Sequence, residues 1–143
     1  MSLLNIRIYG DPVLRKQAEP ITEITDSIRQ LAGDMGESMY VARGVGLAAN
    51  QVGELKRIVV VDVDQVENEG KSSSGKRKTN VERRNLVAYL NPEIVESGVE
   101  DGPQTEGCLS IPGLDGEVYR PLHIKVRYMD LEGNIHELTT GGL

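Results

Sequence analysis

The residues that could do chemistry are few, and the single cysteine is the first of them. Cys108 lies in the stretch EGCLSIP, residues 106–112, where a glycine precedes it and a serine and a proline follow. These neighbours favour a tight, exposed backbone over the middle of a packed strand. The thiol could be a small buried hydrophobe, a nucleophile or a metal ligand. A nucleophile would need a histidine beside it in space, and only His123 and His136 are available.

The histidines do not form a zinc motif with their sequence neighbours. The sequence HELTT, residues 136–140, resembles the start of HExxH, but Thr140 stands where the second histidine is required. The segment also follows a turn and has a strand pattern, in which residues four apart are too distant to share one metal ion. We therefore interpret His136 and His123 as strand residues.

A second near-match, to a phosphate-binding loop, fails as well. The sequence GKSSSGKR, residues 70–77, ends in Arg77 where that motif requires the Ser or Thr that binds magnesium. Nucleotide binding is therefore not expected. The basic cluster in this segment consists of Lys71, Lys76, Arg77 and Lys78. We interpret it as part of a solvated loop.

An amphipathic helix is the first element expected to position the chemical residues. Apolar side chains recur at spacings of three and four, at Ile24, Ile28, Leu31, Met35 and Met39. This spacing predicts one helical stripe that faces the core. Thr25 or Asp26 is expected as the N-cap, and Gly44 as the C′ stop, because glycine accepts the left-handed conformation freely.

Short strands are expected after the helix. Runs rich in β-branched residues predict strands at residues 56–63, 86–90, 94–99, 122–129 and 135–138 and around Val118, with a hairpin turn at 130–134. Residues 64–85 are polar and predict a long solvated hairpin loop. A helix followed by strands predicts an α+β fold with mixed or antiparallel sheets, in one domain over residues 1–143.

Composition narrows the classes of protein. The net charge of −6 argues against general nucleic-acid binding. One cysteine excludes an internal disulfide and fits a reducing compartment. The start MSLLN lacks a secretory signal, and the longest apolar run, residues 58–61, is too short to cross a bilayer. We expect a cytoplasmic or organelle-matrix protein with no membrane partner and no specific nucleic-acid partner.

Two segments together resemble the peptide deformylase family. GVGLAANQ, residues 44–51, matches the family's first motif, GΦGΦAAxQ with Φ apolar, and EGCLS, residues 106–110, matches its second. The opening, from residues 8–15 through the helix that ends at Met39, and the segment 120–133 also match, so the resemblance covers nearly the whole chain. The family removes the formyl group from the N-terminal methionine of nascent chains at the ribosome. The resemblance therefore implies a deformylase-like fold and formyl-Met peptides as substrate.

The resemblance also implies catalytic roles. Cys108 would be the thiolate ligand of a divalent metal ion, Fe²⁺, Zn²⁺ or another, which supplies the activated water. The side chain of Gln51 and the backbone N–H of Leu109 would hold the oxyanion.

The other matched residues imply substrate binding: Gly44, Val45, Gly46, Leu47, Glu106, Gly107 and Arg120. Gly46 would let the substrate backbone lie along the pocket edge like an added strand. Val45 and Leu47 would line or back the pocket for the methionine side chain. Glu106 and Arg120 would form the charged pair that braces the second motif.

The family's third motif, HExxH on a C-terminal helix, has no counterpart in these 143 residues. Neither His123 nor His136 matches its positions, so one of three metal ligands is present and the catalytic glutamate is not. A catalytic site needs three protein ligands and an open position. We therefore expect a C-terminally incomplete deformylase that is inactive as it stands and that exposes an apolar face on its strands.

Three alternatives stay open on the sequence. The chain could be a non-catalytic relative that binds formyl-Met peptides or a protein partner. It could be a half-protein that a second chain carrying HExxH completes. It could be a cysteine hydrolase that uses Cys108, which needs one of the two histidines beside the thiol.

Overall fold

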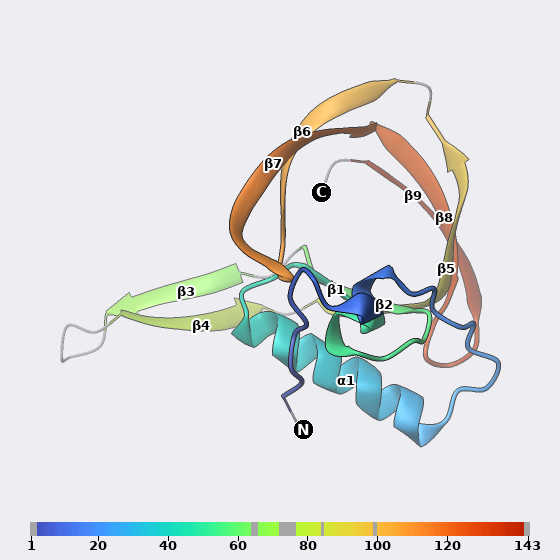
Figure 1. The fold of residues 1–143 in the computed structure, drawn as a ribbon, viewed down its shortest axis with the longest axis horizontal. Coiled ribbons are helices and arrows are strands. Elements are labelled where there is room, and N and C mark those ends of the chain that lie inside the picture. Colours follow the sequence, from blue (N-terminus) through green and yellow to red (C-terminus); the bar gives the residue numbers. More distant parts are fainter. Residues whose placement is uncertain (1–2, 64–65, 72–76, 84, 99, 142–143) are drawn as a thin grey trace.

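One α-helix and an antiparallel five-stranded sheet form the body of the protein (Figure 1). The computed structural model describes residues 3–63, 66–71, 77–83, 85–98 and 100–141, with side chains outside 66–83. The α+β class expected from the sequence is confirmed. No helix in the described part of the chain is long and apolar enough to span a membrane.

The helical elements come early in the chain, and all the strands except β1 follow them. The helices are the 3₁₀ turn η1 (Pro12–Arg15), the α-helix α1 (Asp26–Val41) and the 3₁₀ turn η2 (Ala49–Val52). The main sheet has the order β1 (Gly46–Ala48), β2 (Ile58–Val61), β5 (Val87–Ser97), β8 (His123–Met129) and β9 (Ile135–Gly141). Two separate ribbons pair β3 (Val66–Lys71) with β4 (Arg77–Arg83) and β6 (Asp101–Cys108) with β7 (Ile111–Pro121).

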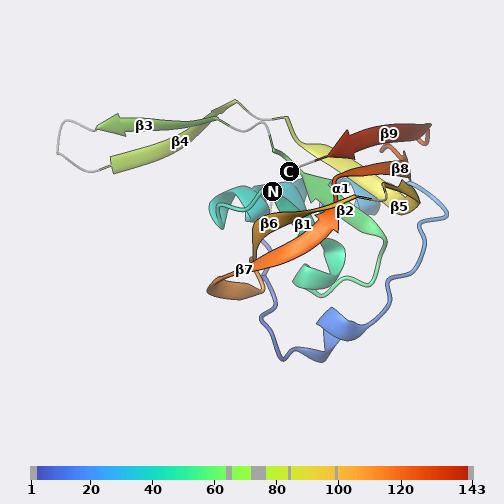
Figure 2. The same cartoon turned by 90° about the horizontal axis from the view of Figure 1, so that it is seen from above.

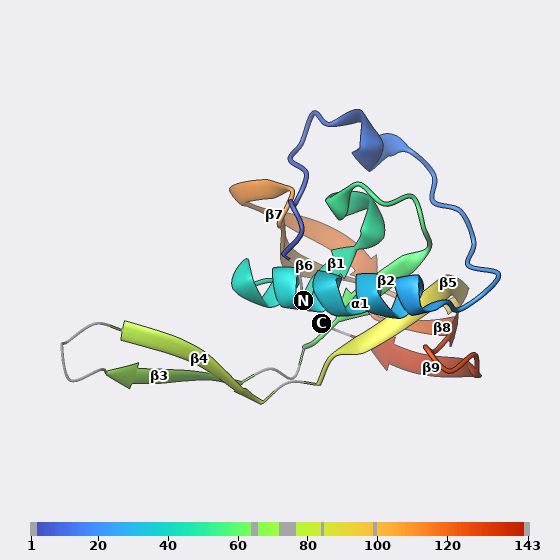
Figure 3. The ribbon, with the colours of Figure 1, turned by 90° about the horizontal axis from the view of Figure 1, so that it is seen from below.

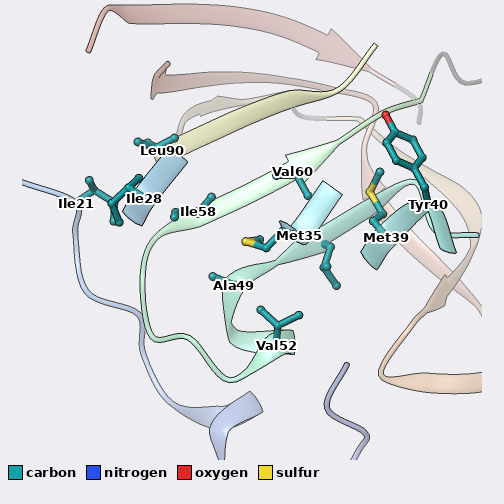
Figure 4. Packing of buried hydrophobic residues seen from close by; sticks show 11 residues of the cluster. Ile21, Ile28, Met35, Met39, Tyr40, Ala49, Val52, Ile58, Val60 and Leu90 are labelled. Carbon is teal, nitrogen blue, oxygen red and sulfur yellow. The ribbon is translucent and has the colours of Figure 1, made fainter. Parts of the chain in front are cut away.

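The hydrophobic core lies between α1 and one face of β1, β2 and β5 (Figures 3 and 4). The predicted helical stripe is confirmed, because Met35 and Met39 are fully buried and Ile28 nearly so. Alternation along β2 turns Ile58 and Val60 toward the helix. The chain has no Phe and no Trp, and apart from Tyr40 the core is aliphatic.

The predicted N-terminal end of α1 is confirmed, and the predicted C-terminal end is wrong. Thr25 is the N-cap, and its side chain accepts a hydrogen bond of 3.3 Å from the N–H of Ile28. The C′ position belongs to Arg43, with a φ of 60°, and not to Gly44 as predicted. Gly44 comes one residue later, where its small size is used for packing against Leu109.

The segment at residues 64–85, predicted as a long polar hairpin loop, contains the β3–β4 ribbon. This ribbon projects away from the body (Figures 1 and 3). The sequences of its strands, VENEGK and RKTNVER, have no apolar alternation for a strand pattern to detect. The basic cluster and the GKSSSGKR segment fall on residues 70–78, whose side chains lie outside the described part.

Among the strands after this ribbon, β5, β7 and β9 are longer than predicted. β5 is continuous where two strands were expected, because a bulge takes up Asn91 and the proline after it. The Asn91 side chain accepts from the N–H and donates to the C=O of Ile21, which ties the bulge to the chain before α1. β6 was not predicted, and β7 was expected only around Val118.

The β6–β7 ribbon carries the second motif to the first. It arcs away from the end of β5 and returns beside β1 (Figures 1 and 2). Its turn is fixed there by the N–H of Tyr9, which donates to the C=O of Ser110 at 2.7 Å. The ribbon therefore brings residues 107–111 next to residues 44–51.

Candidate active site

Cys108 lies at the end of β6, directly before a two-residue turn. The turn residues are Leu109 and Ser110, and Cys108 pairs with Ile111 across it. The thiol is free and exposed, whereas Ser110 is buried. The geometry matches the tight, exposed backbone expected for EGCLSIP.

The Gln51 side chain is held by three contacts, and it reaches the thiol. Its Oε1 accepts from the N–H of Ala48 at 3.0 Å. Its Nε2 donates to Ser110 Oγ at 3.1 Å and faces Cys108 Sγ at 3.5 Å. Since the oxygen is anchored to the backbone of β1, the N–H side of the amide is directed toward the sulfur.

A cavity of about 690 Å³ opens beside this pair, and we name it the Cys108 pocket. Its volume is in the range of small-ligand sites. The predicted site residues that line it are Gly44, Val45, Gly46, Gln51, Gly107, Cys108 and Leu109. The tertiary structure thus brings together residues from two motifs that are more than fifty positions apart.

Glu106 and Arg120 form the pair that the sequence predicted, but they line a different cavity. The guanidinium donates to both carboxylate oxygens, at 2.9 and 3.0 Å. This hydrogen bonding and the positive charge of Arg120 lower the pKa of Glu106. The pair lines a cavity of about 400 Å³, whose wall also includes Val45 and Gly46. It therefore braces the ribbon beside the Cys108 pocket.

Leu47, which was expected to line or back the methionine pocket, does not line the Cys108 pocket. Its side chain is 1% exposed, belongs to the core cluster and lines none of the pockets described. The reason is alternation along β1, which turns Leu47 inward while Gly46 lies at the Cys108 pocket.

The edge of the sheet borders the Cys108 pocket. β1 is the terminal strand in the sheet order, so one of its edges has no neighbour among the described strands. A Cβ at Gly46 would meet only the C=O of Val60, at 3.8 Å, which is an ordinary contact. The packing of the protein does not require a glycine here, so the free space beside Gly46 is available to a ligand.

The described residues do not complete a metal centre. Among them, no group of three or more His, Cys, Asp or Glu side chains could hold a metal ion. His136 is bonded to Asp130 at 2.6 Å, and neither described histidine is hydrogen-bonded to Cys108. Cys108 offers one donor where a catalytic site needs three, and the same observation removes support for a Cys–His nucleophile.

Several residues at this site were not predicted. Ser110 is part of the EGCLS motif, so its position in the motif could have suggested a role. Arg43, Asp115 and the irregular segment 112–114 also line the Cys108 pocket. No sequence pattern indicates these, because their positions depend on how α1 ends and how the ribbon closes.

Comparison with known proteins gives one consistent result. The sequence pattern of the polypeptide deformylase family matches residues 3–143. A peptide deformylase from Caldanaerobacter subterraneus subsp. tengcongensis is 50% identical over 139 residues, which are 96% of this chain and 74% of the relative.

Solved structures agree with the sequence match. The peptide deformylase from Thermotoga maritima has a TM-score of 0.81 and 36% identity, over 99% of this chain and 84% of that one. The enzyme from Ehrlichia chaffeensis, solved in complex with actinonin, has a TM-score of 0.83 and 35% identity, over 99% of this chain and 77% of that one. The chain therefore belongs to the polypeptide deformylase family, whose members are metal-dependent hydrolases.

Proposed function

We propose that this chain binds the formylated methionine at the N-terminus of nascent peptides in the Cys108 pocket. The Gln51 amide and the N–H of Leu109 donate to the formyl oxygen, and Cys108 is the one residue of the described part that would ligate a metal ion. The observation that carries the proposal is the Gln51 amide, whose oxygen is anchored to Ala48 and whose N–H side is directed into the pocket. Pre-oriented donors of this kind stabilise the charge that develops on a carbonyl oxygen.

We also propose where the rest of the substrate lies. Its backbone pairs with the open edge of β1 at Gly46, in the manner of an added strand. The methionine side chain lies against Val45, with Leu47 behind it in the core. Glu106 and Arg120 hold the ribbon that closes the far side. Formylated chains are made by ribosomes, so the proposed place of action is the cytoplasm or a translating organelle.

Hydrolysis in this family depends on a divalent metal ion, and we propose iron or zinc. When bound, such an ion supplies the activated water. The described residues offer it one donor, Cys108. We therefore predict that the 143-residue chain retains no stoichiometric metal and releases no formate from a formyl-Met peptide. Metal analysis together with a formate assay tests this, and stoichiometric metal with turnover would contradict it.

Peptide binding tests the proposal independently of turnover. The affinities of formyl-Met-Ala-Ser amide and Met-Ala-Ser amide are measured by calorimetry on the full chain. One additional hydrogen bond corresponds to about 1 kcal/mol, so the formylated peptide is expected to bind about fivefold more tightly. Equal affinity for the two peptides would overturn the proposal. Formyl-specific binding without turnover would favour a non-catalytic member of the family.

A variant of Gln51 tests the residue itself. Gln51→Glu keeps the oxygen that accepts from Ala48 but replaces the donating amide group, so the preference for the formylated peptide should disappear. Gln17→Glu makes the same change at an exposed glutamine outside the described pockets and should leave the preference intact. If Gln51→Glu also leaves it intact, Gln51 does not contact the formyl group.

A further inference from the structure

The helix α1 ends with an unusual residue for its geometry. The N–H of Gly44 donates to the C=O of Met39 at 2.9 Å, and the N–H of Arg43 donates to the C=O of Tyr40 at 3.0 Å. These two bonds define a Schellman motif, whose C′ residue is left-handed and most often glycine. Here the C′ residue is Arg43, with a φ of 60°. A residue other than glycine destabilises the protein in this conformation. A functional role of Arg43 would explain why arginine is present here.

The Arg43 side chain has a free guanidinium at the Cys108 pocket. It is exposed, lines the pocket beside Gly44 and Val45, and forms no ion pair with any residue that the structure describes. Among the described lining residues, Asp115 is the other charged one. It comes from β7, whereas Arg43 comes from the connection between α1 and β1. The pocket therefore has one unpaired charge of each sign on different elements.

We propose that Arg43 is a specificity-determining residue that binds a carboxylate on the residues following the formylated methionine. This inference rests on the proposed function, which places the formyl group at Gln51 and Cys108 and leaves the rest of the peptide to continue along the pocket. A guanidinium is always charged and pairs with a carboxylate through two parallel hydrogen bonds. Peptides with Glu or Asp near their N-terminus are thus favoured over peptides with Lys or Arg.

The test compares C-terminally amidated peptides, so that the only carboxylate is the one introduced. Formyl-Met-Ser-Ser-Ser amide is the neutral reference, and Glu or Lys replaces each serine in turn. Exposed ion pairs contribute roughly two- to fivefold in affinity, so at one position the Glu peptide should bind that much more tightly than the Lys peptide. The difference should shrink as the salt concentration rises.

Variants of Arg43 test whether this residue causes the preference for the Glu peptide over the Lys peptide. Arg43→Gln should lose the preference, and Arg43→Lys should keep part of it, because lysine retains the charge but cannot form the two parallel hydrogen bonds. Lys16→Gln removes the same charge from an exposed site outside the described pockets and should change nothing. Arg43→Gly should lose the preference and raise the midpoint of thermal unfolding, because glycine accepts the C′ conformation. A fall in this midpoint would contradict the strain from which the inference starts.

The outcomes separate the two proposals. Binding of the neutral peptide with no preference between Glu and Lys peptides overturns the role of Arg43 and leaves the proposed function intact. A preference that persists in Arg43→Gln also overturns it. If no formylated peptide binds, the proposed function and this inference both fail.

Discussion

Close packing at Gly44 fixes the turn that carries Cys108. A Cβ at Gly44 would lie 2.5 Å from Cδ1 of Leu109, which is closer than real Cβ contacts. The Leu109 side chain can therefore occupy its position only because Gly44 has no side chain. Gly33, inside α1, has no heavy atom within 4 Å of the same position and offers a contrast.

Replacing these two glycines by alanine should change stability in opposite directions. Gly44→Ala is expected to lower the free energy of unfolding by about 1 kcal/mol, because Leu109 must move from its site. Gly33→Ala should raise it by about 1 kcal/mol through helix propensity. Urea denaturation measures both changes. Equal stability of Gly44→Ala and the parent chain would show that the turn tolerates the displacement.

Asp130 gives the last hairpin a pH dependence. The hydrogen bond with His136 is the largest cause that lowers the pKa of Asp130, and the N–H groups of Asn134 and Glu132 add to it. A carboxylate whose pKa is lowered in the folded state stabilises the protein at pH values above the usual pKa of that carboxylate. This stabilisation is lost as the pH falls through the folded-state pKa.

Asp130→Asn should therefore reduce stability at neutral pH but not in strong acid. The difference in unfolding midpoint between the parent chain and the variant is expected to shrink as the pH falls below the usual pKa of 3.8. Thermal unfolding between pH 2 and 7 measures it. Glu132→Gln, a neighbouring carboxylate without an ion pair among the described residues, is the control. A difference independent of pH would contradict the prediction.

At the end of β2, a buried carboxylate joins three elements. Asp62 is 1% exposed, and its Oδ2 accepts from Tyr40 Oη of α1 at 2.5 Å and from the N–H of Asn85 before β5 at 2.8 Å. Its own N–H donates to the C=O of Val45, before β1. Buried charge is stable only with such partners, so the position of the first motif depends on this cluster.

Tyr40→Phe should lower the free energy of unfolding by about 2 kcal/mol, because a buried carboxylate loses one donor. Tyr119→Phe removes a hydroxyl from an exposed tyrosine on β7 and should stay within about 0.5 kcal/mol of the parent chain. Guanidinium denaturation of the two variants compares them directly. The role of Asp62 as a junction would be refuted by equal effects of the two substitutions.

The whole molecule has a main sheet with two unlike faces. The face under α1 is closed and includes Val60, which is not exposed at all. The opposite face borders cavities of about 400 and 270 Å³, where half-buried apolar side chains such as Val61 lie. Burial there raises the pKa of Tyr89. An apolar strand face was expected from the sequence, and apolar side chains line both cavities.

Substitution of neighbouring valines should distinguish the faces. Val60→Thr buries a hydroxyl with no partner and is expected to lower the free energy of unfolding by about 2 kcal/mol. Val61→Thr has the same shape change on the open face and should cost less than about 0.5 kcal/mol. The two variants share strand and chemistry, so chemical denaturation isolates the effect of burial. Similar losses would mean that the second face is also closed.

Much of the fold was predictable because its signals are local. The stripe of α1, its Thr25 cap and the β-branched runs of β2 and β8 depend on residues that are close in sequence. The predictions failed where contacts between residues far apart in sequence determine the structure. The bulge at Asn91 joins two predicted strands through hydrogen bonds to Ile21, seventy residues away. β3 and β4 pair without the apolar alternation that marks a strand on a core.

The candidate site, like the fold, could be predicted from the sequence only in part. The sequence alone determined which residue types are present, the two motifs and the family to which they belong, since a motif is an order of side chains along the chain. Only the tertiary structure decided that Gln51 meets Cys108, that Leu47 turns inward and that Arg43 stands free at the pocket. These outcomes depend on where the β6–β7 ribbon returns and how α1 ends, and such contacts form between segments far apart in sequence.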